Sequence, residues 1–331
     1  MNAQSPARPE VLITADFDAE IQRALDDRYT LAVLPAASGP APLTDRLEAA
    51  ELERFEAIVC ETDLVTAEVV AACPRLRLVV SCRANPVNVD TDACRAAGVD
   101  VVTTPARNAD ATADLAFTLL LMTIRQASAA ERWLRAGEWN PEHPYDAYET
   151  FRGMALNGRT LGLVGAGAVG RRVAQRALGF GMRVIAHDPF ADPAELAGLM
   201  TLVSLDEVMS TSDVVSIHAP LNESTSGLIG AAELALMKPS AFLVNAGRAA
   251  IVSEEALLEV LGSRAIAGAG LDVYWTEPLA PDHPLLGLAN VVLTPHIGGA
   301  SDDAIRNHSR QAAAALAAWV AGDEPPNLWR H

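Results

Sequence analysis

The stretch LGLVGAGAVGRRVAQRA, residues 161–177, predicts a strand, a glycine-rich turn and a helix in direct succession. Its glycines follow the pattern GxGxxG, and the apolar run before them and the helical periodicity after them are the context that this pattern requires. The first glycine permits a tight turn, the second lets a pyrophosphate approach the backbone, and the third allows close helix–strand packing. We therefore expect a dinucleotide to bind along Gly165, Ala166, Gly167, Ala168, Val169 and Gly170.

An acidic residue stands where a dinucleotide site needs one. The next predicted strand, RVIAH, ends at Asp188, 18 residues after Gly170. A carboxylate at this point accepts hydrogen bonds from the adenosine ribose and repels a 2′-phosphate. The sequence therefore predicts NAD rather than NADP.

Composition limits the classes of partner. The chain has 331 residues, enough for two domains, and a formal net charge of −17, which argues against nucleic acid or an anionic membrane as a partner. Its four cysteines form no CxxC pair and have no metal-ligand spacing, so we expect free thiols in a reducing cytoplasm and no metal. No run approaches the ~18 apolar residues of a membrane span.

Strand patterns alternate with helical patterns along the chain. This alternation predicts parallel sheets, and we expect two doubly wound α/β domains. The expected strands of the first domain are VLIT (11–14), LAVL (31–34), AIVC (57–60), LRLVVS (76–81) and VDVVTT (99–104). Those of the second are LGLV (161–164), RVIAH (183–187), TLVS (201–204), VVSIH (214–218), AFLVN (241–245), IAGAGLDV (266–273) and NVVLT (290–294).

Two long helical patterns concern the domain organisation. Residues 109–137 give one long helical stretch between the two series of strands, and residues 301–321 give a closing helix rich in alanine. A closing helix can return to pack against the first domain, which would make that domain discontinuous. We expect residues 1–107 with 304–331 to form one domain and residues 108–303 the other.

Three polar motifs follow strands of the second domain. They are NAGRAAIV with Arg248, LDVYWTEP with Asp272 and Glu277, and TPHIGGAS with His296. Ligands of open α/β sheets sit beyond the carboxyl ends of the strands. A histidine beside a carboxylate suits proton donation to a carbonyl during hydride transfer, and an arginine suits a substrate carboxylate. Singly, each residue has an ordinary explanation; together they predict a catalytic acid/base (His296), its partner (Glu277) and a carboxylate ligand (Arg248).

The order of motifs resembles the D-isomer-specific 2-hydroxyacid dehydrogenases. The similarity covers nearly the whole chain and includes SCRANPVNVD, TPARNADATADLAF and the four motifs quoted above. It implies a flavodoxin-like substrate domain completed by the closing helix, a Rossmann NAD domain, an active site in the cleft between them, and a homodimer built largely through the NAD domains. The expected reaction is hydride transfer between NAD and a small 2-hydroxy or 2-keto acid.

The resemblance also implies roles for single residues. Asp272 would bind the nicotinamide carboxamide, and Gly299 would let the backbone lie close to the ring. The backbone N–H groups of Ala84 and Asn85 would bind the substrate carboxylate, although many relatives have glycine in place of Ala84. The remaining expected contacts are Asn108 and Thr112 near nicotinamide and substrate, His218 and Pro220 beside the adenosine, and Arg83 at the substrate.

The sequence alone leaves several alternatives. Arg83 and Arg107 adjoin the substrate motifs and either form a pocket for a phosphate or second carboxylate or make surface ion pairs. Trp139 either packs in an interface or reaches a partner subunit's site. The 2-hydroxy acid is not defined by the sequence. An NAD(H)-sensing binding protein of the corepressor type, without significant turnover, is the alternative to an enzyme.

Overall fold

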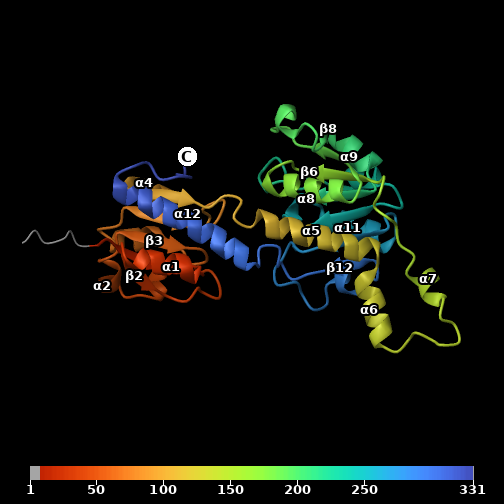
Figure 1. Ribbon diagram of the computed structural model, residues 1–331, viewed down its shortest axis with the longest axis horizontal. Coiled ribbons are helices and arrows are strands. Elements are labelled where there is room, and N and C mark those ends of the chain that lie inside the picture. The colour runs from red at the N-terminus through yellow and green to blue at the C-terminus, as the bar shows by residue number, and fades with distance from the viewer. Residues whose placement is uncertain (1–7, 331) are drawn as a thin grey trace, which may run out of the picture. The chain divides into compact units, whose positions relative to one another are not determined.

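The computed structural model describes residues 8–330 (Figure 1). The chain forms two compact units: the first contains the residues up to Asn108 and those from Ser301 onward, and the second runs from Ala109 to Ala300. Residues 1–7 and His331, which the sequence assigns to the first domain, lie outside the described residues.

The first unit is built on a five-stranded parallel sheet of order β2-β1-β3-β4-β5, the flavodoxin-like order. Its strands are β1 (Glu10–Ile13), β2 (Thr30–Val33), β3 (Ala57–Cys60), β4 (Leu78–Ser81) and β5 (Asp100–Thr103). Its helices are α1 (Ala19–Asp26), η1 (Leu43–Asp45), α2 (Ala49–Leu52), α3 (Ala67–Ala72), α4 (Thr91–Ala96) and α12 (Asp302–Ala321). Strands β3 and β4 are buried along their whole length, and all their residues except Ser81 are apolar, as is typical of parallel strands covered on both faces.

Helix α12 belongs to the first unit and runs beside α1 (Figure 1). The Ser301 hydroxyl accepts a hydrogen bond from the Asp303 N–H at 3.2 Å and begins the helix, and Gly322 ends it at a φ of 78°. Its buried face carries Ala312, Ala315 and Leu316, which pack against the apolar side chains of the sheet. The small residues of this face let the helix lie close to the strands.

The second unit is built on a seven-stranded parallel sheet of order β12-β11-β10-β9-β6-β7-β8. The reversal of strand order on either side of β6 and β9 is that of the Rossmann fold. Its strands are β6 (Thr160–Val164), β7 (Arg183–His187), β8 (Thr201–Leu202), β9 (Val214–Ile217), β10 (Phe242–Asn245), β11 (Gly268–Leu271) and β12 (Val291–Leu293). Its helices are α5 (Ala109–Ile124), α6 (Ala127–Arg135), α7 (Asp146–Thr150), α8 (Ala168–Gly179), η2 (Pro193–Leu196), α9 (Leu205–Thr211), α10 (Ala231–Ala235), η3 (Ala249–Ile251), α11 (Glu254–Gly262) and η4 (Pro284–Gly287).

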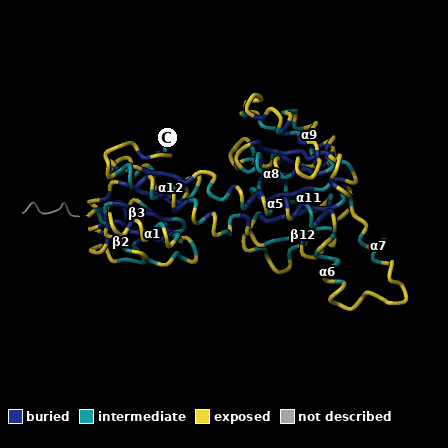
Figure 2. Tube along the Cα trace, viewed as in Figure 1, coloured by how far each residue is buried: buried dark blue, intermediate teal, exposed yellow. Residues whose placement is uncertain are grey.

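The predicted fold class, two doubly wound α/β domains with a flavodoxin-like and a Rossmann sheet, is confirmed. One helical prediction needs correction, because the stretch 109–137 is divided between α5 and α6 by Gln126 at a φ of 52°. Helix α5 is packed in the core, whereas no residue of α6 is buried, and the segment from α6 to α7 is coloured exposed or intermediate throughout in Figure 2. The helix breaks where its packing surface ends. The predicted strand 201–204 is likewise shortened to the two residues of β8.

Two further predictions concern the whole chain. Among residues 8–330 no helix combines the length and the apolarity that crossing a membrane requires. The four cysteines are free and buried, and burial raises the pKa of the Cys60 thiol to about 12 and those of Cys73 and Cys94 to about 11. These thiols are therefore core residues with little thiolate character.

Candidate active site

The glycine-rich turn joins β6 to α8, and its three glycines do different work. Gly165 has a φ of 101°, and a Cβ there would lie 2.5 Å from the Ala219 nitrogen. A Cβ on Gly170 would lie 2.2 Å from the Gly165 carbonyl oxygen. A Cβ on Gly167, at the N-terminus of α8, would meet no protein atom within 4 Å. The protein's own packing requires glycine at 165 and 170, whereas glycine at 167 leaves open space where a pyrophosphate would approach the backbone.

Asp188 holds this turn in place. Its Oδ2 accepts a hydrogen bond from the Ala166 N–H at 2.8 Å, and its Oδ1 accepts one from the Phe190 N–H at 3.0 Å. The carboxylate that follows β7 thus fixes the glycine-rich turn by hydrogen bonds to its backbone. Each oxygen keeps acceptor capacity for a further donor.

His218 follows β9 and packs against the same turn, because its carbonyl carbon is 2.7 Å from where a Gly165 Cβ would be. Its Nε2 lies 2.8 Å from the Ser216 hydroxyl, while its Nδ1 is buried and has no partner among the described residues. Burial lowers the pKa of His218 to about 4, so the ring is neutral. Pro220, which the resemblance placed with His218, is exposed. The unpartnered nitrogen is consistent with a ligand contact on this side of the turn.

A second group of residues gathers at the carboxyl edge of β10, β11 and β12. The register pairs Asn245 with Leu271 and Leu271 with Leu293, so the segments that follow these strands leave the sheet at one level. They carry Arg248, Asp272 with Glu277, and His296, respectively. The structure therefore brings together the residues that the sequence placed after three separate strands.

Asp272 is fully buried and organises the loop that carries His296. Its Oδ1 accepts hydrogen bonds from the Thr294 hydroxyl (2.6 Å) and the Ile297 N–H (2.9 Å), and its Oδ2 accepts one from the Gly298 N–H (2.8 Å). The Thr112 hydroxyl donates to the Gly298 carbonyl at 3.1 Å. Within the protein, the first task of Asp272 and Thr112 is to fix this loop, and Asp272 keeps little acceptor capacity for a cofactor.

His296 and Glu277 form a pair. The His296 Nδ1 is 2.6 Å from the Glu277 Oε2, and the Tyr274 N–H donates to the other carboxylate oxygen at 3.0 Å. Burial alone would raise the pKa of the Glu277 carboxyl, but the hydrogen bonds from His296 and Tyr274 and the charges of His296 and Arg248 outweigh it and lower that pKa. The carboxylate therefore stays ionised and orients the ring, which leaves Nε2 without a partner among the described residues.

Arg248 is exposed and available to an anion. Its Nη1 donates to the Gly247 carbonyl at 2.8 Å, and it makes no ion pair within the described part of the chain. The Asn245 side chain fixes its backbone by donating to the Arg248 carbonyl at 3.1 Å and accepting from the Gly247 N–H at 3.0 Å. Asn245, Tyr274 and Thr294 are site residues that the sequence analysis missed, because their roles come from contacts with motif residues.

The other predicted substrate residues belong to the first unit. Ala84 and Asn85 are exposed after β4, and in residues 8–330 their N–H groups have no acceptor. The Arg83 Nε donates to the Glu61 carbonyl at 2.6 Å, whereas Arg107 is paired with the Glu61 carboxylate and with His308. Asn108 is half-buried at the end of the unit, and Gly299 is half-buried beside Gly298 in the second unit.

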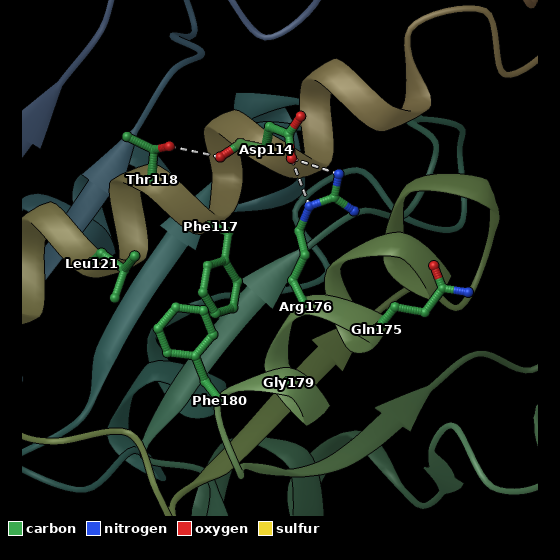
Figure 3. Close-up of a pocket in the computed structure, with 8 residues that line it drawn as sticks. All are labelled: Asp114, Phe117, Thr118, Leu121, Gln175, Arg176, Gly179 and Phe180. Carbon is green, nitrogen blue, oxygen red and sulfur yellow. Dashed lines mark hydrogen bonds and ion pairs between the residues drawn. The ribbon is translucent and has the colours of Figure 1, made fainter.

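Two hollows mark the second unit. One, of about 640 Å³, is lined by Glu277 and His296 together with apolar side chains such as Leu279, Leu286 and Leu293. The other, of about 460 Å³, lies between α5 and α8, where the rings of Phe117 and Phe180 are 4.9 Å apart beside the Asp114–Arg176 ion pair (Figure 3). None of the residues predicted to be functional lines the second hollow. The first hollow is therefore the candidate active site, because His296 and Glu277 line it.

Fold and site together define a dinucleotide-dependent oxidoreductase, and comparisons with known proteins agree. Residues 117–298 match the family model described as D-isomer specific 2-hydroxyacid dehydrogenase, NAD binding domain. The chain is 36% identical over 97% of its length to glyoxylate reductase of Korarchaeum cryptofilum, of which it covers 96%. It is 39% identical over 96% of its length to D-3-phosphoglycerate dehydrogenase of Mycobacterium bovis, of which it covers 58%.

Solved structures give the same answer. The TT0316 protein of Thermus thermophilus superposes with a TM-score of 0.84 at 36% identity, covering 97% of this chain and 100% of that one. A glyoxylate reductase from Paecilomyes thermophila superposes with a TM-score of 0.81 at 32% identity, with 98% of each chain covered. This chain belongs to the D-isomer-specific 2-hydroxyacid dehydrogenase family, and it is an NAD-dependent enzyme of that family.

The glycine-rich turn allows a matched test of cofactor binding. Gly167→Ala should change the free energy of unfolding by less than about 1 kcal/mol, because its Cβ enters open space, yet raise the Kd for NADH at least about tenfold. Gly170→Ala should instead lower the free energy of unfolding by about 2 kcal/mol, because its Cβ meets backbone. Denaturant unfolding and NADH fluorescence titration measure both. Unchanged NADH affinity in Gly167→Ala would contradict the assignment.

His218 should make stability depend on pH. Its folded pKa of about 4 lies below its ordinary value of 6.5, so its contribution is complete above pH 6.5 and is lost as the pH falls towards 4. The loss from this group is at most about 3 kcal/mol. His218→Gln, which cannot gain the proton, should lose correspondingly less stability over this range in melting curves of the two proteins. Parallel losses would show that His218 is not held neutral by the fold.

Proposed function

We propose that the enzyme reduces small 2-keto acids to D-2-hydroxy acids, with His296 as the proton donor. The observation that carries the proposal is the 2.6 Å contact between His296 and Glu277, which leaves Nε2 free to give its proton to the carbonyl oxygen. NADH, when bound along the glycine-rich turn, supplies the hydride. The ionised Glu277 stabilises the protonated ring before transfer and fixes its orientation.

Arg248 is the proposed ligand of the substrate carboxylate. Its guanidinium has no carboxylate partner in the described chain, although acidic residues outnumber basic ones 42 to 25. A planar guanidinium binds a carboxylate with two parallel hydrogen bonds and attracts charge from the adjoining carbonyl. The free N–H groups of Ala84 and Asn85, with Arg83, are the proposed contribution of the first unit, and Asn108 stays a predicted contact.

NAD is the proposed physiological cofactor in preference to NADP. The Asp188 carboxylate, which already accepts from Ala166 and Phe190, would face a 2′-phosphate with like charge. Gly299 and Pro220 keep their predicted cofactor contacts as part of this proposal. Asp272, which already accepts three hydrogen bonds, would offer the nicotinamide carboxamide only the acceptor position that remains on its Oδ2. The NAD(H)-sensing alternative is not favoured, because the groups needed for turnover are all present and the similar proteins named above are dehydrogenases and reductases.

The catalytic pair can be tested against a second pair in the same unit. His296→Ala should lower the rate of glyoxylate or hydroxypyruvate reduction by about 10²–10⁴-fold without weakening NADH binding.

A second substitution tests the carboxylate. The reduction rate should fall as the pH rises, and in Glu277→Gln this fall should occur at a lower pH than in the wild type, because the carboxylate favours the protonated ring. The control is Glu254→Gln, which alters the His283–Glu254 contact at 2.8 Å. Normal rates in His296→Ala would overturn the assignment, and absence of turnover by the wild type on any 2-keto acid would overturn the proposed function.

We also propose that the protein is a homodimer formed through the second unit. Residues 127–151 contain no buried residue, and the side chains of Trp139, Tyr145 and Tyr148 are 53%, 76% and 73% exposed. Exposed aromatic residues concentrated on one segment are typical of an interface.

The oligomeric state is directly measurable. Light scattering after size-exclusion chromatography should give twice the chain mass of 34.9 kDa, and the double substitution Tyr145→Ser with Tyr148→Ser should lower that mass at equal concentration. The matched control is Phe190→Ser, which removes an aromatic side chain that is 89% exposed but lies outside this segment. A monomeric wild type would contradict the proposal.

A further inference from the structure

Four charged or titratable side chains meet at the carboxyl edge of the first unit's sheet. Glu61 follows β3, Arg83 follows β4 and Arg107 follows β5, which are neighbours in the sheet, and His308 comes from α12. The register pairs Cys60 with Ser81 and Ser81 with Thr103, so the three strands end at one level. The loop of Ala84 and Asn85, whose N–H groups have no acceptor in the described chain, leaves the same edge.

Arg107 is already committed within the protein. Its Nη2 donates to the Glu61 carboxylate and its Nη1 lies 2.9 Å from the His308 Nδ1. A guanidinium only donates, so Nδ1 accepts and the His308 Nε2–H donates to the Asp16 carbonyl at 2.6 Å. His308 is therefore neutral, and the fully buried ring and the half-buried Arg107 and Glu61 side chains form a continuous chain of hydrogen bonds.

Arg83, unlike Arg107, is not paired with a carboxylate in the described chain. Its Nε donates to the Glu61 carbonyl, and its guanidinium makes no ion pair in residues 8–330. The charges of this cluster are two arginines and one glutamate, which leaves one net positive charge. A 2-keto monocarboxylate is a single anion, whereas a phosphorylated 2-keto acid brings about −1.5 to −2 more.

We propose that Glu61 is a specificity-determining residue: by neutralising Arg107 it leaves Arg83 as the available cation of this cluster, so the enzyme selects 2-keto monocarboxylates and excludes phosphorylated ones. The inference rests on the proposed function, and it answers the question of whether Arg83 and Arg107 form a phosphate pocket. A phosphate at this edge would lack a second cation from the cluster and would face the Glu61 carboxylate. Specificity by an unfavourable charge requires no contact with the accepted substrate.

The test compares hydroxypyruvate with 3-phosphohydroxypyruvate, which differ by the phosphate alone. With NADH, the wild type should show a kcat/KM at least about 100-fold higher for hydroxypyruvate, and Glu61→Gln should reduce this ratio at least about tenfold, mainly through a lower KM for the phosphorylated substrate. Glutamine keeps an oxygen for Arg107 and removes only the charge. Glu61→Asp, which keeps the charge, should retain the wild-type ratio.

A matched control separates a local effect from a change in net charge. Glu56→Gln removes the same charge from the Arg75–Glu56 surface pair of the first unit and should leave the ratio unchanged. A second measurement needs no variant: glycolate should inhibit wild-type glyoxylate reduction more strongly than 2-phosphoglycolate does.

The outcomes are distinct. Equal use of both substrates by the wild type, or an unchanged ratio in Glu61→Gln, would overturn the role of Glu61 while leaving the dehydrogenase function in place. Stronger inhibition by 2-phosphoglycolate would also overturn it. Failure of the wild type to reduce hydroxypyruvate, glyoxylate or any other 2-keto acid while still binding NADH would instead overturn the proposed function, and the inference with it.

Discussion

The buried carboxylate of Asp272 is the interaction on which the rest of the candidate site depends. It lies at the end of β11, in the interior of the sheet, and receives three hydrogen bonds from the segment after β12. A fully buried carboxylate is tolerated only when its oxygens are satisfied, so the segment is held to one path. The path of this segment fixes the position of the His296 backbone. Glu277, five residues after Asp272, then fixes the orientation of the His296 ring through its contact with Nδ1.

The two units arrange their polar residues in the same way, although the residues themselves differ. In each, parallel strands end at one level and the polar residues that follow them form a cluster. In the second unit the cluster leaves, within the described chain, one arginine without an ion-pair partner and one imidazole nitrogen without a hydrogen-bond partner. In the first unit, most of the charged groups are already paired within the protein, because Arg107 is hydrogen-bonded to both Glu61 and His308. The groups at a sheet edge that can bind a ligand are therefore those that are not already paired with other side chains of the protein.

Much of this arrangement was predictable from the sequence. The strand–turn–helix pattern around Gly165, with Asp188 after the next strand, was sufficient for the Rossmann sheet, and the alternation of elements was sufficient for both doubly wound domains. The motifs with Arg248, Glu277 and His296 were predictable as neighbours, because strands of one parallel sheet end together. The break between α5 and α6 was not, since the helical periodicity continues through Gln126 and only the loss of packing partners ends the helix. The commitment of Arg107 to His308 was also hidden, because those residues are 201 positions apart.

One conformational detail of the second unit has a wider consequence. His296 has a φ of 53°, a left-handed conformation that costs a residue with a side chain about 1 kcal/mol or more and that glycine or asparagine adopts more readily. The hydrogen bonds from the loop to Asp272 hold the backbone in this conformation. Selection for folding alone would favour glycine at position 296. At this position the backbone conformation favours glycine, whereas the proposed reaction needs histidine. In a library of variants selected only for thermal stability, we would therefore expect His296 to be replaced and activity to be lost.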